Sequence, residues 1–332
     1  MIISRTPFRI SLFGGGTDYP AWYSEHGGAV IGTTINKYCY ISIRSLPPFF
    51  EHRHRIVYSQ IELPSSVGEI EHPAVRAVLK EHNVEEGVEI QHHGDLPARS
   101  GMGSSSSFTV GLLHAVRAFR GQMSSPRWLA REAIRIEHDV IQEQVGAQDQ
   151  IWAAYGGTNL ITLYPDGKFH VRPIIISPER RKDLEMHMLL FFTGFSRVAG
   201  TIAAQEIPNL KRRAPELQSL IQMVHEAACI LQDPNRHIRE IGTMLQEAWQ
   251  IKKQLADCVS NGAIDQIYAA AMNAGAAGGK LLGAGGGGFM LVLAEPRYHD
   301  RIRQALKGLI EVSFSTGSAG SSIVLYEPDG LE

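Results

Sequence analysis

The chain has 332 residues, 44% of them hydrophobic and 20% charged, so it is long enough to form two cores and is unlike a disordered protein. A formal net charge of -2 provides no field that would hold a polyanion, which argues against nucleic acid and membrane surfaces as partners. Three scattered cysteines, Cys39, Cys229 and Cys258, predict neither a disulfide framework nor a zinc site. With no signal-peptide pattern and no apolar run of membrane-spanning length, we expect a cytoplasmic protein.

The first half of the chain is predicted to begin as sheet. Its first hundred residues are mostly extended in pattern, with β-rich runs over residues 29–46, 55–63 and 87–91. Two helices are predicted to follow, one over residues 105–120 and one from Ser125-Pro126 to a stop at Gly146. A β section over residues 158–176 contains the turn Pro165-Asp166-Gly167, which predicts a hairpin.

The second half begins after a polar, proline-containing segment at residues 178–181. We therefore expect an N-terminal domain over residues 1–180 and a C-terminal domain over residues 181–332. The predicted elements of the latter are a strand at 186–192, three helical stretches between 199 and 274, a strand at 289–293, a helix at 297–309 and a strand at 322–326. Strands and helices mix without a regular βαβ repeat, which favours the α+β class.

Glycines are concentrated in three bunches, and the central one has the pattern of a phosphate site. Gly101-Met102-Gly103 lies between a predicted strand and a predicted helix, where backbone amides lack intrahelical acceptors and attract anions. The serines at 104–107 could cap the helix, bind phosphate oxygens or ligate Mg²⁺, and a plain serine cap is the alternative interpretation. The spacing matches neither a Walker loop nor a dinucleotide fingerprint.

The other two bunches are less specific. Gly14-Gly15-Gly16 is followed by Asp18 and could be an ordinary turn or part of a site. The run from 283 to 288 holds five glycines in six positions, so either close backbone packing or the approach of a ligand must offset their entropy cost.

Three charged residues are candidates for chemistry. Glu137 falls within the apolar arc of its predicted helix, where a buried carboxylate needs a metal or an arginine, and a structural ion pair is equally consistent. Asp149 near a helix start could be a cap or a base. Arg9 in an apolar strand could be an edge residue or ion-paired. The histidines are not spaced as zinc ligands.

The three glycine bunches together resemble the three motifs of the GHMP kinases, the family of galactokinase, homoserine kinase and mevalonate kinase. Residues 6–19 are similar to the first motif, residues 96–107 to the second and residues 280–289 to the third, with Glu137 and Gly146-x-x-Asp149-Gln150 between them. The resemblance implies a kinase fold of the α+β class, with a ribosomal-protein-S5-like N-terminal domain and a ferredoxin-like C-terminal domain. It also implies ATP and Mg²⁺ as cofactors.

The resemblance also implies roles for individual residues. Asp149 matches the family's catalytic aspartate and Arg9 the basic residue beside it, while Glu137 and Ser105 match its Mg²⁺ ligands. The residues implied to hold the ATP phosphates are Pro97, Arg99, Ser100, Gly101, Met102, Gly103, Ser104, Ser105, Ser106 and Ser107. Those implied to bind the acceptor are Gly15, Gly16, Asp18, Gly156, Gly157, Gly285 and Gly286.

The acceptor is expected to be a sugar phosphate. Galactokinase-like members carry Glu-His where this chain has Gly15-Gly16, whereas residues 14–20, 33–38 and 49–55 resemble the branch that phosphorylates the anomeric hydroxyl of a heptose 7-phosphate. Such a substrate would need a basic clamp, for which the sequence offers Lys37, Arg44, Arg53 and Arg55. A kinase for an unphosphorylated sugar such as fucose or another hexose, and a non-catalytic sensor with the same fold, are the alternatives. The sequence does not indicate an oligomeric state.

Overall fold

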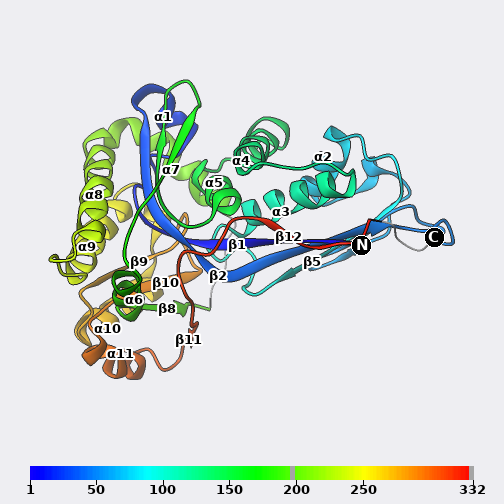
Figure 1. The fold of residues 1–332 in the computed structure, drawn as a ribbon. Coiled ribbons are helices and arrows are strands. Elements are labelled where there is room, and N and C mark those ends of the chain that lie inside the picture. The colour runs from blue at the N-terminus through cyan, green and yellow to red at the C-terminus, as the bar shows by residue number, and fades with distance from the viewer. Residues whose placement is uncertain (195–198, 329–332) are drawn as a thin grey trace.

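A computed structural model of the protein describes residues 1–194 and 199–328, which form two sheets with helices packed against them (Figure 1). The larger sheet has the order β12-β1-β2-β5-β3-β4, and β6 and β7 extend it from β2. Its pairs are antiparallel except β3 with β5. The strands are β1 (Ile2–Phe13), β2 (Gly28–Ser45), β3 (Arg55–Val57), β4 (Ile61–Glu62), β5 (Val88–Gly94), β6 (Thr158–Leu163), β7 (Phe169–Pro173) and β12 (Ser322–Tyr326).

Helices cover one face of the larger sheet, as Figure 1 shows for α2 to α5. The central helix α3 packs on β1 and β2 and buries Leu112, Ala115 and Val116 completely. Burial of a leucine or valine side chain stabilises the fold by about 1.5–3 kcal/mol. The elements of this layer are α1 (Pro20–His26), a 3₁₀ turn at Val67–Glu69, α2 (Pro73–Glu81), α3 (Ser104–Phe119), α4 (Pro126–Arg135), a π turn at Ile136–Val140 and α5 (Gln148–Tyr155).

The smaller sheet has the order β11-β8-β10-β9 and is antiparallel throughout. Helix α9 packs on β9 and its neighbour α8 packs on β1 and β2, so this helix pair connects the two sheets. The elements are α6 (Pro178–Met186), β8 (Met188–Phe192), α7 (Ala199–Glu206), a 3₁₀ segment at Ile207–Arg213, α8 (Ala214–Gln232), α9 (Arg239–Lys253), a 3₁₀ turn at Asp257–Val259, α10 (Gly262–Asn273), β9 (Gly278–Leu281), β10 (Phe289–Leu293), a 3₁₀ turn at Pro296–Tyr298, α11 (His299–Ala305) and β11 (Ile310–Glu311).

Several predicted boundaries were wrong. The helix expected to run to Gly146 ends at Val140 in a π turn, where the amide of Ile141 donates to the carbonyl oxygen of Ile136. The mostly extended first hundred residues include α1 and α2, and the polar segment after Ser177 is helix α6, capped by the Ser177 hydroxyl. Four α-helices, not three, lie among the described residues between 199 and 274.

The predicted division into residues 1–180 and 181–332 stays a prediction, and the last four of those residues lie outside the described part of the chain. The final strand β12 returns to pair with β1, so the larger sheet contains a strand from the predicted C-terminal domain. Across residues 1–194 and 199–328, every helix is too short or too polar to cross a bilayer.

Candidate active site

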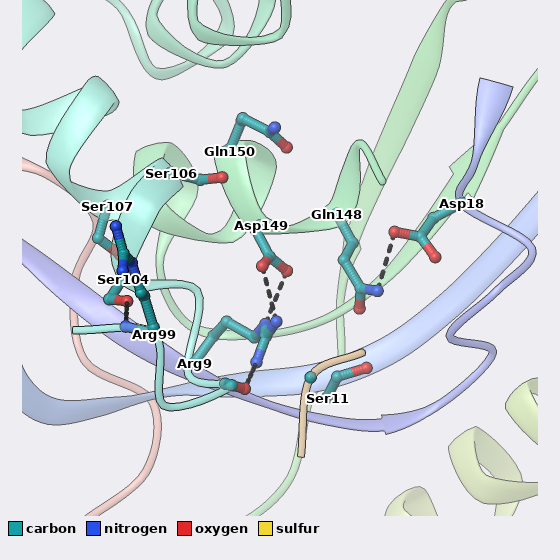
Figure 2. A network of polar contacts seen from close by, with 12 residues as sticks. Arg9, Ser11, Asp18, Arg99, Ser104, Ser106, Ser107, Gln148, Asp149 and Gln150 are labelled. Atoms are coloured by element: carbon teal, nitrogen blue, oxygen red, sulfur yellow. Dashed lines mark hydrogen bonds and ion pairs between the residues drawn. The ribbon is translucent and has the colours of Figure 1, made fainter. Parts of the chain in front are cut away.

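The centre of the candidate site is an ion pair between Arg9 on β1 and Asp149 in the first turn of α5. Arg9 donates through Nε and Nη2 to the two carboxylate oxygens of Asp149, each at 2.7 Å, which is the bidentate geometry of a strong pair (Figure 2). The Arg9 side chain is 5% exposed and that of Asp149 is 23% exposed, so the carboxylate faces the accessible side. The structure therefore brings together two residues that lie 140 positions apart.

The loop over residues 97–107 wraps around this pair. Arg9 donates from Nη1 to the carbonyl oxygen of Gly101 at 2.5 Å. The backbone amide of Arg9 donates to the carbonyl oxygen of Met102 at 3.1 Å. A Cβ placed on Gly103 would lie 3.3 Å from both Arg9 Cγ and Asp149 Oδ2, and the φ of +75° at this position also favours glycine. These contacts hold the loop against the ion pair.

Helix α3 begins at the end of this loop with its N-terminus open. Gly103, in the left-handed region at φ 75°, precedes Ser104, and within the described residues no side chain caps the helix. The hydroxyl of Ser104 instead accepts from the amide of Arg99, and that of Ser107 donates to the carbonyl oxygen of Pro7. The first amides of this 16-residue helix are left without a side-chain cap from the described residues, which disfavours the plain serine cap considered from the sequence and suits the binding of an anion.

The remaining residues of this predicted set differ in exposure. Pro97, Arg99 and Ser105 are exposed, whereas Ser100 and Met102 are fully buried. Arg99 has φ 58°, an uncommon left-handed backbone for a residue with a side chain, which bends the loop at this point.

The third glycine bunch supports the phosphate loop by close backbone packing. A Cβ on Gly283 would lie 2.5 Å from the Cα of Gly101, and one on Gly288 would collide with the carbonyl oxygen of Ser100. The predicted acceptor ligands Gly285 and Gly286 lie against Val259, to which the amide of Gly286 donates at 2.9 Å. Of the two explanations left open by the sequence, these contacts favour backbone packing.

Asp18, from the first glycine bunch, is buried close to Asp149. It is 2% exposed, and its two oxygens accept from the Gly16 amide at 3.0 Å and from Gln148 Nε2 at 2.9 Å (Figure 2). Burial, and next the charge of Asp149, raise the pKa of Asp18. A Cβ on Gly146 would collide with the Asp18 carboxylate, which explains a glycine at that position.

The two glycines before Asp18 have different surroundings. A Cβ on Gly16 would lie 3.3 Å from Leu217 Cδ2, so this residue packs on α8. A Cβ on Gly15 would lie 3.8 Å from Gln148 Nε2 and would meet nothing closer among the described atoms, so there is space beside Gln148.

Gly156 and Gly157 lie at the end of α5 and contact the C-terminal segment. The amide of Gly157 donates to the carbonyl oxygen of Ser318 at 2.7 Å, and Gly156 forms a bridge with Ala319. These contacts anchor the segment that leads into β12, and the predicted acceptor-binding role of the two glycines stays a prediction.

Glu137, in the π turn, lies buried against the start of α3 as its helical periodicity predicted. It is 1% exposed, and its Oε2 accepts from the hydroxyl of Ser106 at 2.9 Å and from Gln150 Nε2 at 2.5 Å. Its Oε1 is buried without a direct hydrogen bond to any described residue. Burial raises the pKa of Glu137 to about 7, and the hydroxyl of Thr109 is a further donor that acts on this carboxylate and opposes the rise of its pKa. The structural ion pair considered from the sequence is not what this carboxylate forms.

This arrangement fits a hard cation. An orphaned carboxylate oxygen and a neighbouring hydroxyl at the start of α3 are the donor types that Mg²⁺ prefers. The serine that contacts Glu137 is Ser106, whereas the predicted ligand Ser105 has an exposed side chain. The role of Ser105 as a Mg²⁺ ligand stays a prediction, and Ser106 is a second hydroxyl that the structure brings to Glu137.

Sequence reasoning missed two buried lysines next to the site. Lys280 on β9 is 6% exposed and donates to the carbonyl oxygens of Ser11 and Leu12, each at 3.1 Å, which ties the smaller sheet to β1. Burial, with Lys252 and Arg9 nearby, holds the pKa of Lys280 well below its ordinary value. Lys252 on α9 donates to the carbonyl oxygen of Gly283. The sequence feature that could have indicated a buried Lys280 is a single lysine within a glycine-rich, apolar strand.

Three of the four basic residues proposed as a phosphate clamp, Arg44, Arg53 and Arg55, are engaged elsewhere, and the role of Lys37 in β2 stays a prediction. Glu89 lies 2.5 Å from Arg44 and 3.3 Å from Arg55, and Arg53 donates to the carbonyl oxygen of Glu85. Arg44 lies ten residues along β2 from Thr34, the partner of Arg9, which corresponds to roughly 30 Å of strand. These arginines are too distant to hold a substrate at Asp149.

Comparison with known proteins defines the class. Residues 69–157 match the GHMP kinases N terminal domain and residues 215–311 match the GHMP kinases C terminal domain. A D-glycero-alpha-D-manno-heptose 7-phosphate kinase of Campylobacter jejuni is 27% identical over 92% of this chain and 93% of its own. A mevalonate kinase of Pyrococcus horikoshii is 28% identical over 68% of this chain and 65% of its own.

Two further proteins extend the comparison. The bifunctional fucokinase/GDP-fucose pyrophosphorylase of Arabidopsis thaliana is 27% identical over 87% of this chain, which spans 29% of that longer protein. The crystal structure of a D-glycero-D-manno-heptose 1-phosphate kinase from Bacteroides thetaiotaomicron superposes with a TM-score of 0.71 at 23% identity, over 97% of this chain and 98% of that one. This last similarity concerns the fold.

The chain belongs to the GHMP kinase family. It is an ATP-dependent phosphotransferase that acts on an alcohol group of a small molecule. The α+β prediction and the family resemblance are both confirmed. The next question is which small molecule carries the alcohol group that accepts the phosphoryl group.

Proposed function

We propose that this chain transfers the γ-phosphoryl group of ATP to the anomeric hydroxyl of D-glycero-α-D-manno-heptose 7-phosphate, giving the 1,7-bisphosphate used in GDP-heptose biosynthesis. The similarity to the Campylobacter enzyme over nearly the full length of both chains supports this acceptor. The observation that carries the proposal is the Asp149–Arg9 pair next to buried Asp18, because it joins a base, a cation and a hydroxyl-binding carboxylate in one place.

In this proposal Asp149 orients the acceptor hydroxyl and takes its proton, a role that typically contributes about 10²–10⁴-fold. Arg9 holds the Asp149 carboxylate in place through its bidentate contact, and offers positive charge to the transferring phosphoryl group. The open amides at the start of α3 would hold the ATP phosphates. Phosphoryl transfer requires mainly positioning and charge neutralisation, and these groups supply both.

A sugar fits the acceptor pocket better than mevalonate does. Asp18 offers two carboxylate oxygens, each receiving one hydrogen bond and able to accept another, and Gln148 Oε1 is buried without a partner among the described residues. Acceptors of this kind bind hydroxyl groups and repel a carboxylate such as that of mevalonate. This argument supports a polyhydroxylated acceptor.

For the cation, we propose that Glu137 and Ser106 hold Mg²⁺, with Ser105 as the alternative hydroxyl. When bound, the ion would neutralise charge on the ATP phosphates. The orphaned Oε1 of Glu137 supports this assignment, since a buried carboxylate oxygen without a donor carries a desolvation cost that a cation removes.

The experiment that tests the acceptor is ATP turnover against a panel of heptose 7-phosphate, mannose 6-phosphate, fucose, galactose, mevalonate and homoserine. Turnover with heptose 7-phosphate alone would support the proposal. Mannose 6-phosphate is the matched control, because it keeps a distal phosphate and lacks one carbon. If it is used equally well, the distal phosphate rather than the heptose skeleton sets specificity.

Fucose is the second candidate acceptor, favoured by the similarity to fucokinases of Arabidopsis thaliana and Bacteroides fragilis over 87% and 92% of this chain. Turnover of fucose without the phosphorylated sugars would replace the first proposal with this one. If ATP binds and no acceptor is turned over, a ligand sensor with a kinase fold becomes the better description.

A further inference from the structure

Two glutamines flank Asp149 on α5, and each one holds a different buried carboxylate. Gln148 donates from Nε2 to Asp18 at 2.9 Å, and Gln150 donates from Nε2 to Glu137 at 2.5 Å. Figure 2 shows the three side chains leaving the same helical turn in different directions, with Asp18 on the Gln148 side. Residues two positions apart in an α-helix point about 200° apart, so one turn reaches both carboxylates.

Both amides turn the same way toward their carboxylates. Each glutamine directs its NH₂ group at a carboxylate oxygen, Gln148 at Asp18 and Gln150 at Glu137, and turns its Oε1 away. Both Oε1 atoms are buried and have no hydrogen-bond partner within the described residues. A glutamine that served only to satisfy a buried carboxylate would be expected to have both ends paired, as buried polar groups usually are.

The surroundings of Gln148 favour an acceptor-side role. Its neighbour Asp149 is the proposed base, and the space beside Gly15 lies next to its amide. Asp18 has no room to move toward Gly146, because even a Cβ there would collide with it. Gln148 therefore fixes the carboxylate from the side on which an acceptor hydroxyl would approach.

Gln150 lies next to Glu137 and Ser106, the residues of the candidate cation site. It is fully buried, and the Glu137 oxygen that it contacts also receives the Ser106 hydroxyl. With two donors on Oε2, the other oxygen of Glu137 is left for a cation. Gln150 thus decides which carboxylate oxygen is free.

We propose that Gln148 and Gln150 are paired positioning residues, Gln148 orienting Asp18 for the acceptor sugar and Gln150 orienting Glu137 for the divalent cation. The inference rests on the proposed function in taking Asp18 as an acceptor ligand and Glu137 as a cation ligand. It adds that one turn of α5 aligns both ligands with the base between them, so that acceptor and cation affinities are set by two separate side chains.

The test compares Gln148→Met and Gln150→Met, which remove each amide at nearly constant side-chain length. Acceptor binding is measured by calorimetry in the presence of a non-hydrolysable ATP analogue, using whichever acceptor the unmodified chain turns over. Binding of Mn²⁺, as a probe for Mg²⁺, is measured with the same analogue by electron paramagnetic resonance. Unfolding midpoints of both variants show whether either substitution disturbs the fold.

We expect Gln148→Met to weaken acceptor binding by about 10- to 100-fold and to leave Mn²⁺ binding within about two-fold, since a hydrogen bond to a charged group is lost at one site. Gln150→Met should do the reverse. Equal effects of both variants on both ligands, or no effect of either, would overturn the inference, because each variant is the other's control.

Failure of the proposed function has a different signature. If the unmodified chain turns over no acceptor, that function fails, and the Mn²⁺ measurement still decides the inference: Gln150→Met must weaken Mn²⁺ binding and Gln148→Met must not. If another acceptor replaces heptose 7-phosphate, both measurements proceed with it unchanged.

Discussion

Two carboxylates on one helical segment have opposite surroundings. Glu132, on the outer side of α4, receives two hydrogen bonds from Arg135 at 3.0 and 2.8 Å and lies 3.3 Å from His82. Glu137, five residues later, is surrounded by neutral donors only: Ser106 and Gln150 donate to one oxygen, and the Thr109 hydroxyl also acts on the carboxylate. The hydrogen bond with His82, followed by that with Arg135, lowers the pKa of Glu132 to about 2, whereas burial raises the pKa of Glu137 to about 7.

The difference separates a carboxylate that stabilises the fold from one that is kept for a ligand. Around Glu132 the chain supplies positive charge of its own from Arg135, which contacts both Glu132 and Glu81 at 2.8 Å. Around Asp18 and Glu137 it supplies amides and hydroxyls but too little positive charge, so burial raises the pKa of both groups. We expect substitutions in the first region to affect stability and those in the second to affect turnover.

The largest expected effect is that of Asp149→Asn. Asp149 and Glu132 both receive a bidentate arginine, so Glu132→Gln is the matched control. Turnover of Asp149→Asn should fall by about 10²–10⁴-fold, because the amide cannot take the acceptor proton. Binding of ATP, measured by calorimetry, should persist. Retention of more than a tenth of the turnover would remove Asp149 from the role of base.

The next largest effect is expected for Glu137→Gln. Turnover should fall by about 10²-fold or more, since a charge that organises the cation and the phosphates is lost. The unfolding midpoint without ligands should stay the same or rise, because the substitution removes a buried carboxylate that has no cation. A fall in the midpoint with normal turnover would assign Glu137 to the same structural class as Glu132.

The sequence predicted these two environments to different degrees. Helical periodicity assigned Glu137 to the apolar side and Glu132 to the polar side. The 1% exposure of Glu137 confirms the first assignment, whereas the Glu132 side chain is only 15% exposed because it lies against His82 and Arg135. The strands at Phe289–Leu293 and Ser322–Tyr326 and the hairpin between β6 and β7 were also found from local pattern. These features depend on residues close in the chain, which is where sequence reasoning is strongest.

The features that the sequence did not give depend on distant contacts. Asp18 and Gln148 are 130 positions apart, and Lys280 and Ser11 are 269 apart, so no spacing rule relates them. The contact between Ser106 and Glu137 could not be predicted either, because side-chain direction depends on where α3 starts, and the left-handed backbone of Gly103 sets that point. The π turn that ends the helix before Gly146 has no sequence signal comparable to a proline.

A smaller effect is expected for Glu132→Gln, which tests the structural half of the comparison. The unfolding midpoint at neutral pH should fall by about 2–5 °C, because Arg135 and His82 lose the charge that they contact. Turnover at saturating substrates should remain within about two-fold of the unmodified chain. Glu247→Gln, at an exposed position on α9, is the control and should change neither quantity. A large loss of turnover in Glu132→Gln would mean that the outer network also supports the site.

The smallest expected effect is a pH dependence of the unfolding midpoint. It tests whether the charge of Glu132 is the origin of the stabilisation that this residue provides. The pKa of Glu132 is lowered from an ordinary value of 4.5 to about 2, so its stabilising contribution is complete above pH 4.5 and is lost as the pH falls toward 2. The difference in unfolding midpoint between the unmodified chain and Glu132→Gln should therefore shrink as the pH falls from about 4.5 toward 2. Thermal unfolding of both proteins across this range measures it. A difference that stays constant down to pH 3 would show that hydrogen-bond geometry or packing, rather than the ionised carboxylate, stabilises this side of α4.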